Sequence, residues 1–400
     1  MKKFLTVVLI IVAVIALIVG GLAIANKISE VSMNEYIDSF AKVEYDEADP
    51  QLVPELDEHG NWYFVTDGDF KIMQITDVHI GGGVLSREKD MKAMNAIAAM
   101  IAYEKPDLVI STGDMAATYP HSGSLNNKYS HTYFARLMER LGVYWTVNFG
   151  NHDSEIYNFY DRAEVAAMYE NDEYKYCLFS AGPEDVSGYG NHVINVKNSA
   201  GAVTQSLIMM DTHAYTENDP LGLAWDYDYV KEDQIQWYRD VIDLYAPEGD
   251  SVHKSLLFIH IPLIEVHDAY WEYVNRYSQN TDVKFISGHA GESDQVVYGS
   301  KTDTDLFETM VEMGSTQGMF YGHDHLNNFV LEYKGIIMSY GYSIDYFAYA
   351  DIDKWGYQRG CQMITCHTDG SFDIEHENYY QDKYVPLYEK EVVDMSKNPQ

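Results

Sequence analysis

Five short clusters of polar side chains follow five apolar stretches of the sequence, and their residue types are those that bind metal ions. The clusters are QITDVHIG with Asp77 and His79, STGDM with Asp114, NFGNHD with Asn151, His152 and Asp153, FIHIP with His260, and YGHDH with His323 and His325. Carboxylate and amide oxygens mixed with imidazole nitrogens, without a thiolate, suit Mn, Fe, Zn or Co. Each cluster alone is a weak signal, but five in this order predict one shared metal site.

The last cluster places two histidines two residues apart, directly after a glycine, in FYGHDHLNNF. In an extended segment, residues i and i+2 point to the same side, so His323 and His325 are expected to face one target while Asp324 points away. For this stretch by itself, a solvent-exposed histidine pair is an equal alternative. The other four clusters favour the metal site.

The apolar stretches before these clusters are predicted to be strands of an α/β sheet. FKIMQIT and PDLVIST flank SREKDMKAMNAIAAMIAYEK, whose apolar residues at 91, 94, 97 and 101 have helical spacing. A strand, a helix and a strand in this order form a βαβ unit with parallel strands. Ligands of α/β sheets bind outside the carboxyl ends of the strands, so the five clusters are expected to converge there.

The ordered set D-x-H, G-D, G-N-H-D, H and G-H-x-H resembles the calcineurin-like metallophosphoesterase family. FIHIPLIEV, GHAGES and GHDHLNNF are most similar to its purple-acid-phosphatase-like branch, and the resemblance covers about residues 70–345. It implies an α/β fold of the metallophosphoesterase type, a four-layer α/β/β/α sandwich. It also implies two divalent metal ions at the strand ends.

The resemblance assigns a ligand set to the two metals. Asp77, His79 and His325 would bind one ion, Asn151, His260 and His323 would bind the second, and Asp114 would bridge both. Purple enzymes of the family differ by a glycine in place of His79 and a tyrosine in place of Ala117. No tyrosinate-to-iron colour is therefore expected, and the identity of the metals stays open among Mn, Fe, Zn and Co.

Other residues of the clusters are expected to lie around the metals. The resemblance implies that His152 protonates the leaving-group oxygen, with support of its loop as the alternative. Asp153 is expected to have a supporting role. His289 and Glu292 in SGHAGESDQ are expected at the substrate rim or in a solvated loop, and Asp211 and His213 either in a surface turn or at the site.

The function that follows is hydrolysis of a small phosphate ester. Two ions about 3.5–4 Å apart would hold a bridging hydroxide that attacks phosphorus in line. The branch favours phosphomonoesters, so a phosphatase is the first hypothesis and a phosphodiesterase or nucleotide hydrolase the second. A non-catalytic cell-surface binding module is a third hypothesis from another class.

The charge and the N-terminal segment bear on partners and location. A net charge of -35, from 27 basic and 62 acidic residues, argues against a nucleic-acid partner. The segment Phe4–Ala25 carries no charge and is about 22 residues long, enough to span a bilayer. We expect an uncleaved anchor at the cell membrane with Lys2 and Lys3 in the cytoplasm and the catalytic domain outside. Secretion after cleavage at Ala23-Ile24-Ala25 is the alternative.

These observations divide the chain into four parts. Residues 1–27 are predicted to be a membrane anchor or signal peptide, and 28–69 an extracytoplasmic stalk with a leading strand near NWYFVTDGDF. Residues 70–380 are predicted to form the metallophosphoesterase domain, and 381–400 a C-terminal tail.

Overall fold

The computed structural model describes residues 2–246, 252–276, 282–293, 296–349, 352 and 359–393. Its helices are α1 (Lys2–Asp38), α2 (Arg87–Glu104), α3 (Asn127–Leu141), α4 (Arg162–Tyr169), α5 (Glu232–Leu244), α6 (Ile264–Arg276) and α7 (Leu306–Met313). Its strands are β1 (Glu55–Leu56), β2 (Trp62–Val65), β3 (Phe70–Ile75), β4 (Leu108–Thr112), β5 (Trp145–Asn148), β6 (His192–Lys197), β7 (Val203–Met209), β8 (Ser255–Phe258), β9 (Val283–Ser287), β10 (Thr316–Tyr321), β11 (Val330–Tyr333), β12 (Ile336–Tyr340), β13 (Gly360–Cys366) and β14 (Phe372–Asn378).

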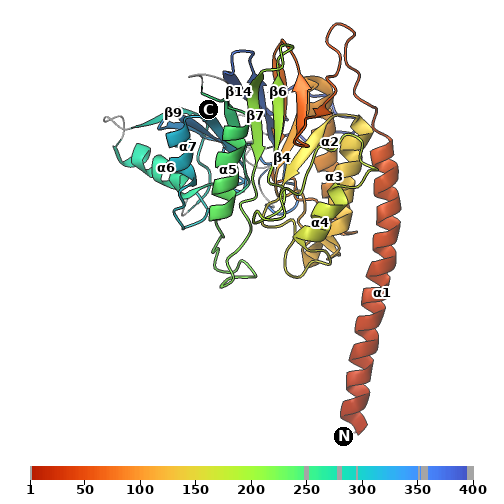
Figure 1. Ribbon diagram of the computed structural model, residues 1–400. Coiled ribbons are helices and arrows are strands. Elements are labelled where there is room, and N and C mark those ends of the chain that lie inside the picture. The colour runs from red at the N-terminus through yellow and green to blue at the C-terminus, as the bar shows by residue number, and fades with distance from the viewer. Residues whose placement is uncertain are drawn as a thin grey trace.

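The strands form two sheets that pack face to face, with helices on the outer face of each (Figure 1). Within the described residues, one sheet has five strands in the order β14-β13-β3-β4-β5, and the other has nine in the order β1-β2-β6-β7-β8-β10-β12-β11-β9. Three apolar clusters fill the spaces between the layers. One packs α1, α2 and α3 on the first sheet, one packs α5, α6 and α7 on the second, and one lies between the sheets. The predicted α/β sandwich is therefore confirmed.

The parallel strands carry their carboxyl ends to the same end of the molecule. In the first sheet β3, β4 and β5 are parallel, and in the second β7, β8, β10 and β12 are parallel. The βαβ unit β3-α2-β4 is formed as predicted, and the hairpins β11–β12 and β13–β14 turn at Lys334-Gly335 and Asp369-Gly370. Several elements were not predicted, namely α4, α6, α7, β6 and β9.

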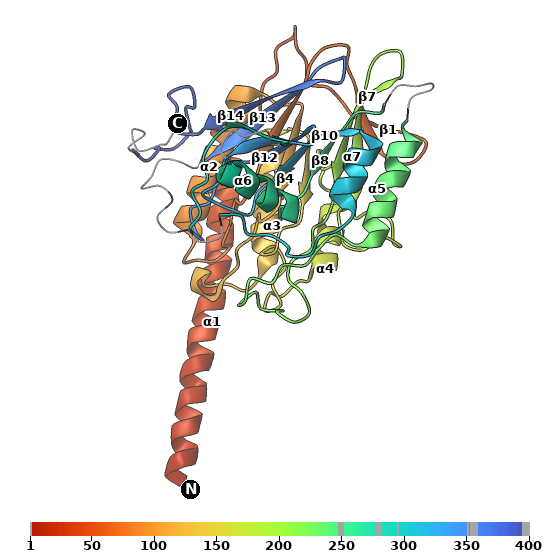
Figure 2. The same ribbon diagram turned by 90° about the vertical axis from the view of Figure 1, so that its left-hand side faces the viewer.

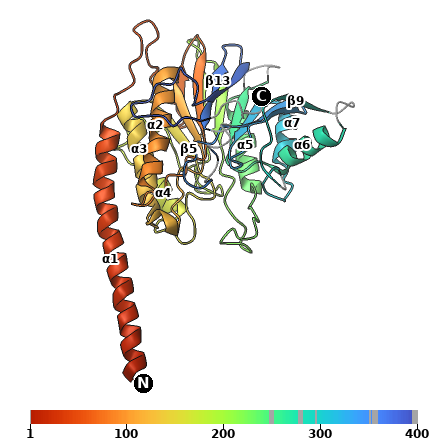
Figure 3. The ribbon, with the colours of Figure 1, turned by 180° about the vertical axis from the view of Figure 1, so that it is seen from behind.

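The segment predicted to be a stalk is instead part of the packed structure. Helix α1 continues unbroken from the apolar run to Asp38, and Met33, Ile37, Phe40 and Val43 are buried in the core that α2 and α3 share. The residues 33, 36, 37 and 40 have the i, i+3, i+4, i+7 spacing of a buried helix face, which the acidic composition of the segment obscures. Figures 2 and 3 show that only the N-terminal part of α1 projects from the domain.

The predicted C-terminal tail also packs on the domain over its described part. The ring of Tyr388 stacks on Tyr36 of α1 at 4.6 Å between centroids, and the Tyr388 backbone NH donates to Asn95 of α2. Lys390 donates through Nζ to the backbone oxygens of Tyr379 and Tyr384. Residues 394–400 of the predicted tail lie outside the described residues.

Candidate metal centre

The loops that follow β3 and β4 are joined to each other by backbone hydrogen bonds. The amide of Asp77 donates to Gly113 O at 3.1 Å, and that of His79 donates to Asp114 O at 3.0 Å. Two further bonds join Ile80 to Met115 and Ala117 to Ile80. The first two polar clusters of the sequence therefore form one backbone unit, and their side chains are fixed relative to each other.

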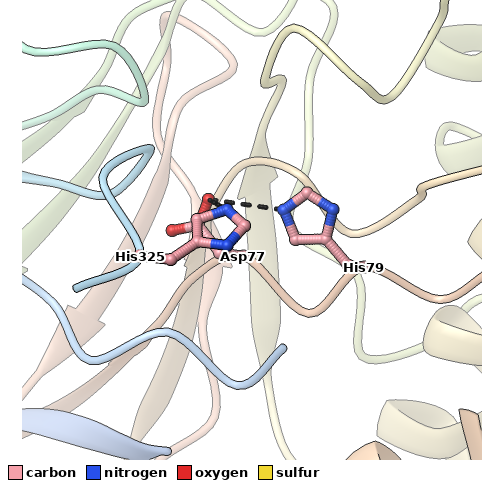
Figure 4. A group of neighbouring side chains, drawn as sticks. All are labelled: Asp77, His79 and His325. Atoms are coloured by element: carbon pink, nitrogen blue, oxygen red, sulfur yellow. Dashed lines mark ion pairs between the residues drawn. The ribbon is translucent and has the colours of Figure 1, made fainter. Parts of the chain in front are cut away.

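A first group of potential ligands consists of Asp77, His79 and His325, all of them buried. The Oδ1 atom of Asp77 lies 3.7 Å from His79 Nε2 and 3.5 Å from His325 Nε2. Figure 4 shows the two imidazoles converging on this carboxylate from separate loops. The three side chains have the types and the proximity that a metal ion requires.

A second group consists of Asp114, His260 and His323. The Nε2 atom of His260 lies 3.1 Å from Asp114 Oδ2 and 3.3 Å from Asn151 Oδ1. His260 Nδ1 donates to Thr112 O at 2.7 Å, which turns its Nε2 lone pair toward the group. The same Oδ2 atom of Asp114 lies 3.7 Å from His79 Nε2, so this carboxylate adjoins both groups.

Four residues of these groups have backbone angles that residues other than glycine seldom adopt. The φ angles of Asp77, His79, Asp114 and His323 are 50°, 52°, 53° and 77°. Left-handed backbone costs about 1–3 kcal/mol per residue and concentrates at functional sites. The chain therefore carries local strain at the positions where these side chains converge.

Several atoms in the site are arranged as metal ligands would be. Among the described residues, both ring nitrogens of His79 are buried without a hydrogen-bond partner, whereas Asp114 Oδ2 and His325 Nδ1 lie beside His260 and Asp345. Buried polar atoms are normally paired, so the unpaired imidazole of His79 points to a bound ion. A Cβ atom at Gly113 would lie 2.5 Å from His260 Nδ1, and the φ angle of Gly113 is 91°, so this glycine is needed for the close approach. The residues present fit two cations.

The charges of the site also favour cations. Burial lowers the pKa of His260, but the carboxylates of Asp114 and Asp77 outweigh burial and raise it to about 9. Burial raises the pKa of Asp114, but His260 and His152 outweigh burial and hold it well below its usual range. Ionised carboxylates thus lie in a site that excludes most water, where they attract positive charge strongly.

Asp153 holds the loops and does not face the metal groups. Its Oδ2 accepts from the amides of Asp114 at 2.9 Å and Gly150 at 2.7 Å, and its Oδ1 accepts from Ala116 at 2.9 Å. His131 Nε2 bonds to the backbone oxygen of Asp153 at 2.9 Å. This buried carboxylate connects the loop after β4 to the loop after β5.

His152 faces the cavity beside the metal groups. Its side chain keeps 23% of its surface exposed, and its ring centroid lies 5.5 Å from that of His79. Its Nδ1 bonds to Glu155 Oε1 at 2.7 Å. Burial lowers the pKa of His152, but the carboxylates of Asp114 and Glu155 outweigh burial and raise it. The imidazole therefore holds its proton more tightly than in water.

The cavity over the metal groups has a volume of about 380 Å³ and is lined largely by aromatic rings. The aromatic lining residues are Tyr119, Trp225, Tyr227, Tyr298 and Tyr349. Glu292 also lines it, and its carboxylate accepts from Leu326 N and from Tyr349 Oη, each at 3.0 Å. His289 is not among the lining residues, and its backbone pairs with Asn328.

Sequence reasoning missed several residues that contact the ligand side chains. Asp345 Oδ2 lies 3.3 Å from His325 Nδ1, and Tyr215 Oη accepts from Asn151 Nδ2 at 2.8 Å. Arg162 donates to Gly150 O and to the buried Asp211, so Asp211 supports the Asn151 loop and is not in a surface turn. Asp345 follows strand β12 in the same strand-then-acid pattern as the five clusters, which was an available signal.

The two histidines after β10 line one cavity, as predicted, but the backbone that carries them is not extended. Strand β10 ends at Tyr321, and His323 has a φ angle of 77°, which is not extended backbone. The two imidazoles consequently reach different groups, His323 beside His260 and His325 beside Asp77. Asp324 does point away, and its carboxylate accepts from Tyr340 Oη.

The comparisons with known proteins agree with this geometry. The family model for the calcineurin-like phosphoesterases matches residues 70–336. Two relatives from Arabidopsis thaliana are named "Probable inactive purple acid phosphatase 28" and "Probable inactive purple acid phosphatase 14". The first is 26% identical over 315 residues, which cover 72% of this chain and 73% of the relative. The second is 27% identical over 329 residues, which cover 75% of this chain and 76% of the relative.

A yeast relative and a solved structure extend these comparisons. "Phosphatase DCR2" of Saccharomyces cerevisiae is 26% identical over 297 residues, 66% of this chain and 45% of that protein. The crystal structure of a dimetal phosphatase from Danio rerio has a TM-score of 0.50 at 14% identity, over 79% of this chain and 98% of that one. The latter likeness supports the fold.

Proposed function

The chain belongs to the calcineurin-like phosphoesterase family, and from this premise we propose that it is a phosphatase that hydrolyses phosphomonoesters with two divalent metal ions. The observation that carries the proposal is the pair of ligand groups that adjoin at Asp114. In the proposed set, Asp77, His79 and His325 would hold one ion. Asn151, His260 and His323 would hold the other, and Asp114, which adjoins both groups, would serve both. Mn, Fe, Zn or Co suits this donor set.

Side chains around the two ligand groups have separate roles in the proposed reaction. Bound cations would supply Lewis acidity toward the phosphoryl oxygens and an activated water as nucleophile. His152 donates a proton to the leaving-group oxygen, and Glu155 orients its imidazole through Nδ1 so that Nε2 faces the cavity. Asp153 keeps the backbone of Asp114 in place. The aromatic walls of the cavity exclude water from the reacting phosphate.

Two other functions compete with this proposal. A phosphodiesterase or nucleotide hydrolase would use the same ligands, and it differs only in the substrate. A non-catalytic module is suggested by the names of the Arabidopsis relatives, which call those proteins probably inactive. Against that second reading, all seven proposed ligand residues and His152 are present in this chain, and among the described residues both ring nitrogens of His79 are buried without a hydrogen-bond partner.

Turnover of p-nitrophenyl phosphate and of bis(p-nitrophenyl) phosphate by the purified full chain tests the proposal. We expect faster hydrolysis of the monoester, loss of activity in a chelator, and recovery when Mn, Fe, Zn or Co is added back. Preference for the diester would favour the phosphodiesterase. Bound metal without turnover of either ester would favour the non-catalytic module.

The proposed location is the outer side of the cell membrane. Helix α1 is long and apolar enough to cross a membrane, and its residues after Asn26 pack on the domain. The side chains of Val19, Leu22 and Ala23 line a groove against the loop 120–126. This contact supports retention of the helix as an anchor, while a secreted form after cleavage remains the alternative.

A further inference from the structure

Helix α1 leaves the domain at the end where the metal groups lie. Asn26 Nδ2 donates to Gly123 O at 2.7 Å, and Asn26 Oδ1 accepts from Val84 N at 2.8 Å. Both partners lie in loops beyond the carboxyl ends of β3 and β4, which also carry the ligands Asp77 and Asp114. From Asn26 the chain runs along the domain to Asp46, which lies at the amino ends of these strands and pairs there with Lys105. The apolar part of α1 thus extends from the end that carries these loops, and Figures 1 and 2 show the helix projecting beyond the domain.

The domain lies directly against the segment that would enter the bilayer. Val19, Leu22 and Phe159 line a groove of about 380 Å³ between α1 and the loop 120–126. The run Phe4–Leu22 has about 19 residues and is about 28 Å long at 1.5 Å per residue, close to the hydrocarbon thickness of about 30 Å. With that run in the membrane, Leu22 lies at the boundary, and the loops beside it lie at the same level.

Large apolar side chains are exposed on the loops at this end. They come from the loops after β3, β5 and β7 and are Leu85, Ile156, Phe159, Leu221, Leu223 and Trp225, which we call the membrane-side rim. Leu223 is 81% exposed, and Trp225 is 55% exposed while it also lines the metal cavity. Exposed apolar groups gathered beside a site mark an interaction surface. An aromatic ring at the cavity mouth suits the membrane interface.

The loop that carries Leu221, Leu223 and Trp225 is held in shape by its own hydrogen bonds. The carboxylate of Asp219 is buried and accepts from the amides of Leu223, Ala224 and Asp226. Thr216 bonds to Asp226 through both its backbone and its side chain. The leucines are thus presented to solvent on a formed loop, so little conformational entropy is lost when they are buried.

We propose that the membrane-side rim rests on the bilayer that holds α1, and that the substrate is a lipid phosphomonoester whose head group enters the metal cavity from that surface. The inference rests on the proposed phosphatase function and on the uncleaved anchor. The net charge of -35 disfavours a strongly anionic surface, so a largely neutral bilayer with a minor phosphorylated lipid is the matching partner.

The test uses the full chain reconstituted in phosphatidylcholine vesicles that contain a minor fraction of phosphatidic acid or of a prenyl monophosphate. We expect release of phosphate from one of these lipids. The double variant Leu221→Ser, Leu223→Ser should release phosphate from the lipid at least about tenfold more slowly than the wild type, because two apolar side chains of the membrane-side rim are removed. Its turnover of p-nitrophenyl phosphate should equal that of the wild type. Leu56→Ser, an exposed leucine at the opposite end of the domain, is the matched control.

The outcomes separate this inference from the proposed function. Turnover of p-nitrophenyl phosphate without hydrolysis of either lipid, or equal lipid activity in the double variant, would overturn the inference and leave the phosphatase standing. Failure on all substrates with metals supplied would overturn both.

A spin label provides a readout that does not depend on activity. A label at Leu223→Cys should be accessible to a lipid-soluble relaxation reagent at the acyl-chain boundary. A label at Ala200→Cys, in the β6–β7 turn at the far end of the domain, should be accessible to a water-soluble reagent. Equal water exposure at both positions would refute docking of the rim.

Discussion

At the scale of single residues, Asp114 is the side chain that lies beside both ligand groups. Its Oδ2 atom lies 3.1 Å from His260 and 3.7 Å from His79, which belong to different ligand groups. Its Oδ1 accepts from the amide of His152 at 2.8 Å, so the same carboxylate also positions the loop of the proposed general acid. Loss of its charge should therefore affect both metals.

Asp114→Asn removes this negative charge while it preserves the size of the side chain. We expect fewer than two metal ions per chain and a loss of turnover of at least about 100-fold, since even residues that only support ligands cost 10–100-fold. Elemental analysis and p-nitrophenyl phosphate assays measure the two effects. Asp172→Asn, an exposed aspartate, is the control. Two bound metals with normal turnover would contradict the shared role of Asp114.

His152→Ala should separate catalysis from metal binding. An alkyl alkoxide is a poor leaving group and needs a proton, whereas p-nitrophenolate leaves without one. Hydrolysis of an alkyl phosphate should therefore fall about 10²–10⁴-fold, and that of p-nitrophenyl phosphate clearly less. Metal content should stay at the wild-type level.

Glu155→Gln is the companion variant for this prediction. It removes the charge on the His152 Nδ1 partner and keeps the shape, so a smaller loss with the same leaving-group preference is expected. If His152→Ala lost activity equally on both esters and also lost metal, His152 would only support its loop.

The types of the ligand residues could be predicted from sequence, but their conformations could not. Aspartate and histidine at strand ends are visible as letters, whereas φ angles of 50–77° at Asp77, His79, Asp114 and His323 arise from the tertiary packing of the loops. For this reason the alternation argument was wrong about the backbone at His323, although both imidazoles do line one cavity. Glu155 was within reach of prediction, because it stands three residues after His152.

At the scale of elements, Asp153 joins the loops after β4 and β5. Three backbone amides donate to its two oxygens. Such a buried acceptor decides whether the loops keep their shape, because an amide left without its acceptor has no access to water.

Asp153→Asn replaces one accepting oxygen by a donor that faces backbone N–H groups. We expect the free energy of unfolding to fall by about 1–3 kcal/mol, since a buried group becomes unsatisfied. Denaturant unfolding in chelator measures this loss without a contribution from metal binding. Asp185→Asn, at an exposed position, should leave the value unchanged. An unchanged midpoint in Asp153→Asn would contradict the linking role.

The elements that could be predicted are those whose residues form a clear local pattern in the sequence. The apolar runs of β3, β4, β8 and β10 and the helical spacing of apolar residues in α2 were visible in sequence. The end of α1 was hidden, because acidic residues stand between its buried residues in the sequence. Arg140 of α3 also fixes the chain just after the helix by bonding to Phe40 O.

At the scale of the whole molecule, the proposed anchor would fix the side of the membrane on which the domain lies. Lys2 and Lys3 precede the apolar run, and positively charged flanks stay in the cytoplasm. A reporter fused after residue 400 should therefore be active only as an extracytoplasmic enzyme. The N-terminal sequence of the mature protein is the second measurement. An Asn26 N-terminus would show cleavage and contradict the anchor.

Buried polar side chains join the two sheets of the molecule. Asn148 of β5 donates to Met210 O at 3.0 Å and to Phe258 O at 2.8 Å, and Gln74 of β3 donates to Tyr321 O at 3.2 Å. In a third link, Thr146 Oγ1 bonds to His192 Nε2 at 2.7 Å. These partners are far apart in the sequence, so no local pattern predicts them.

His192 makes the third link sensitive to pH. It is buried, its Nδ1 bonds to Gly190 O at 2.8 Å, and the neutral ring satisfies both of its hydrogen bonds. Burial lowers the pKa of His192 from 6.5 to about 4. Between these pH values the unfolded chain takes up a proton and the folded chain does not. The free energy of unfolding should therefore fall as the pH drops from 6.5 toward 4, by at most about 3 kcal/mol from this residue.

The variant His192→Asn isolates this effect from the titration of the metal site. Unfolding should be followed between pH 7 and pH 4 in chelator for the wild type and the variant, with the exposed His59→Asn as control. The substituted asparagine side chain does not titrate in this range, so the difference in stability between wild type and His192→Asn should change in favour of the variant as the pH falls. His253 is also buried with its pKa lowered to about 4, and it contributes equally to both proteins. A difference that is independent of pH would show that His192 titrates alike in the folded and unfolded chains.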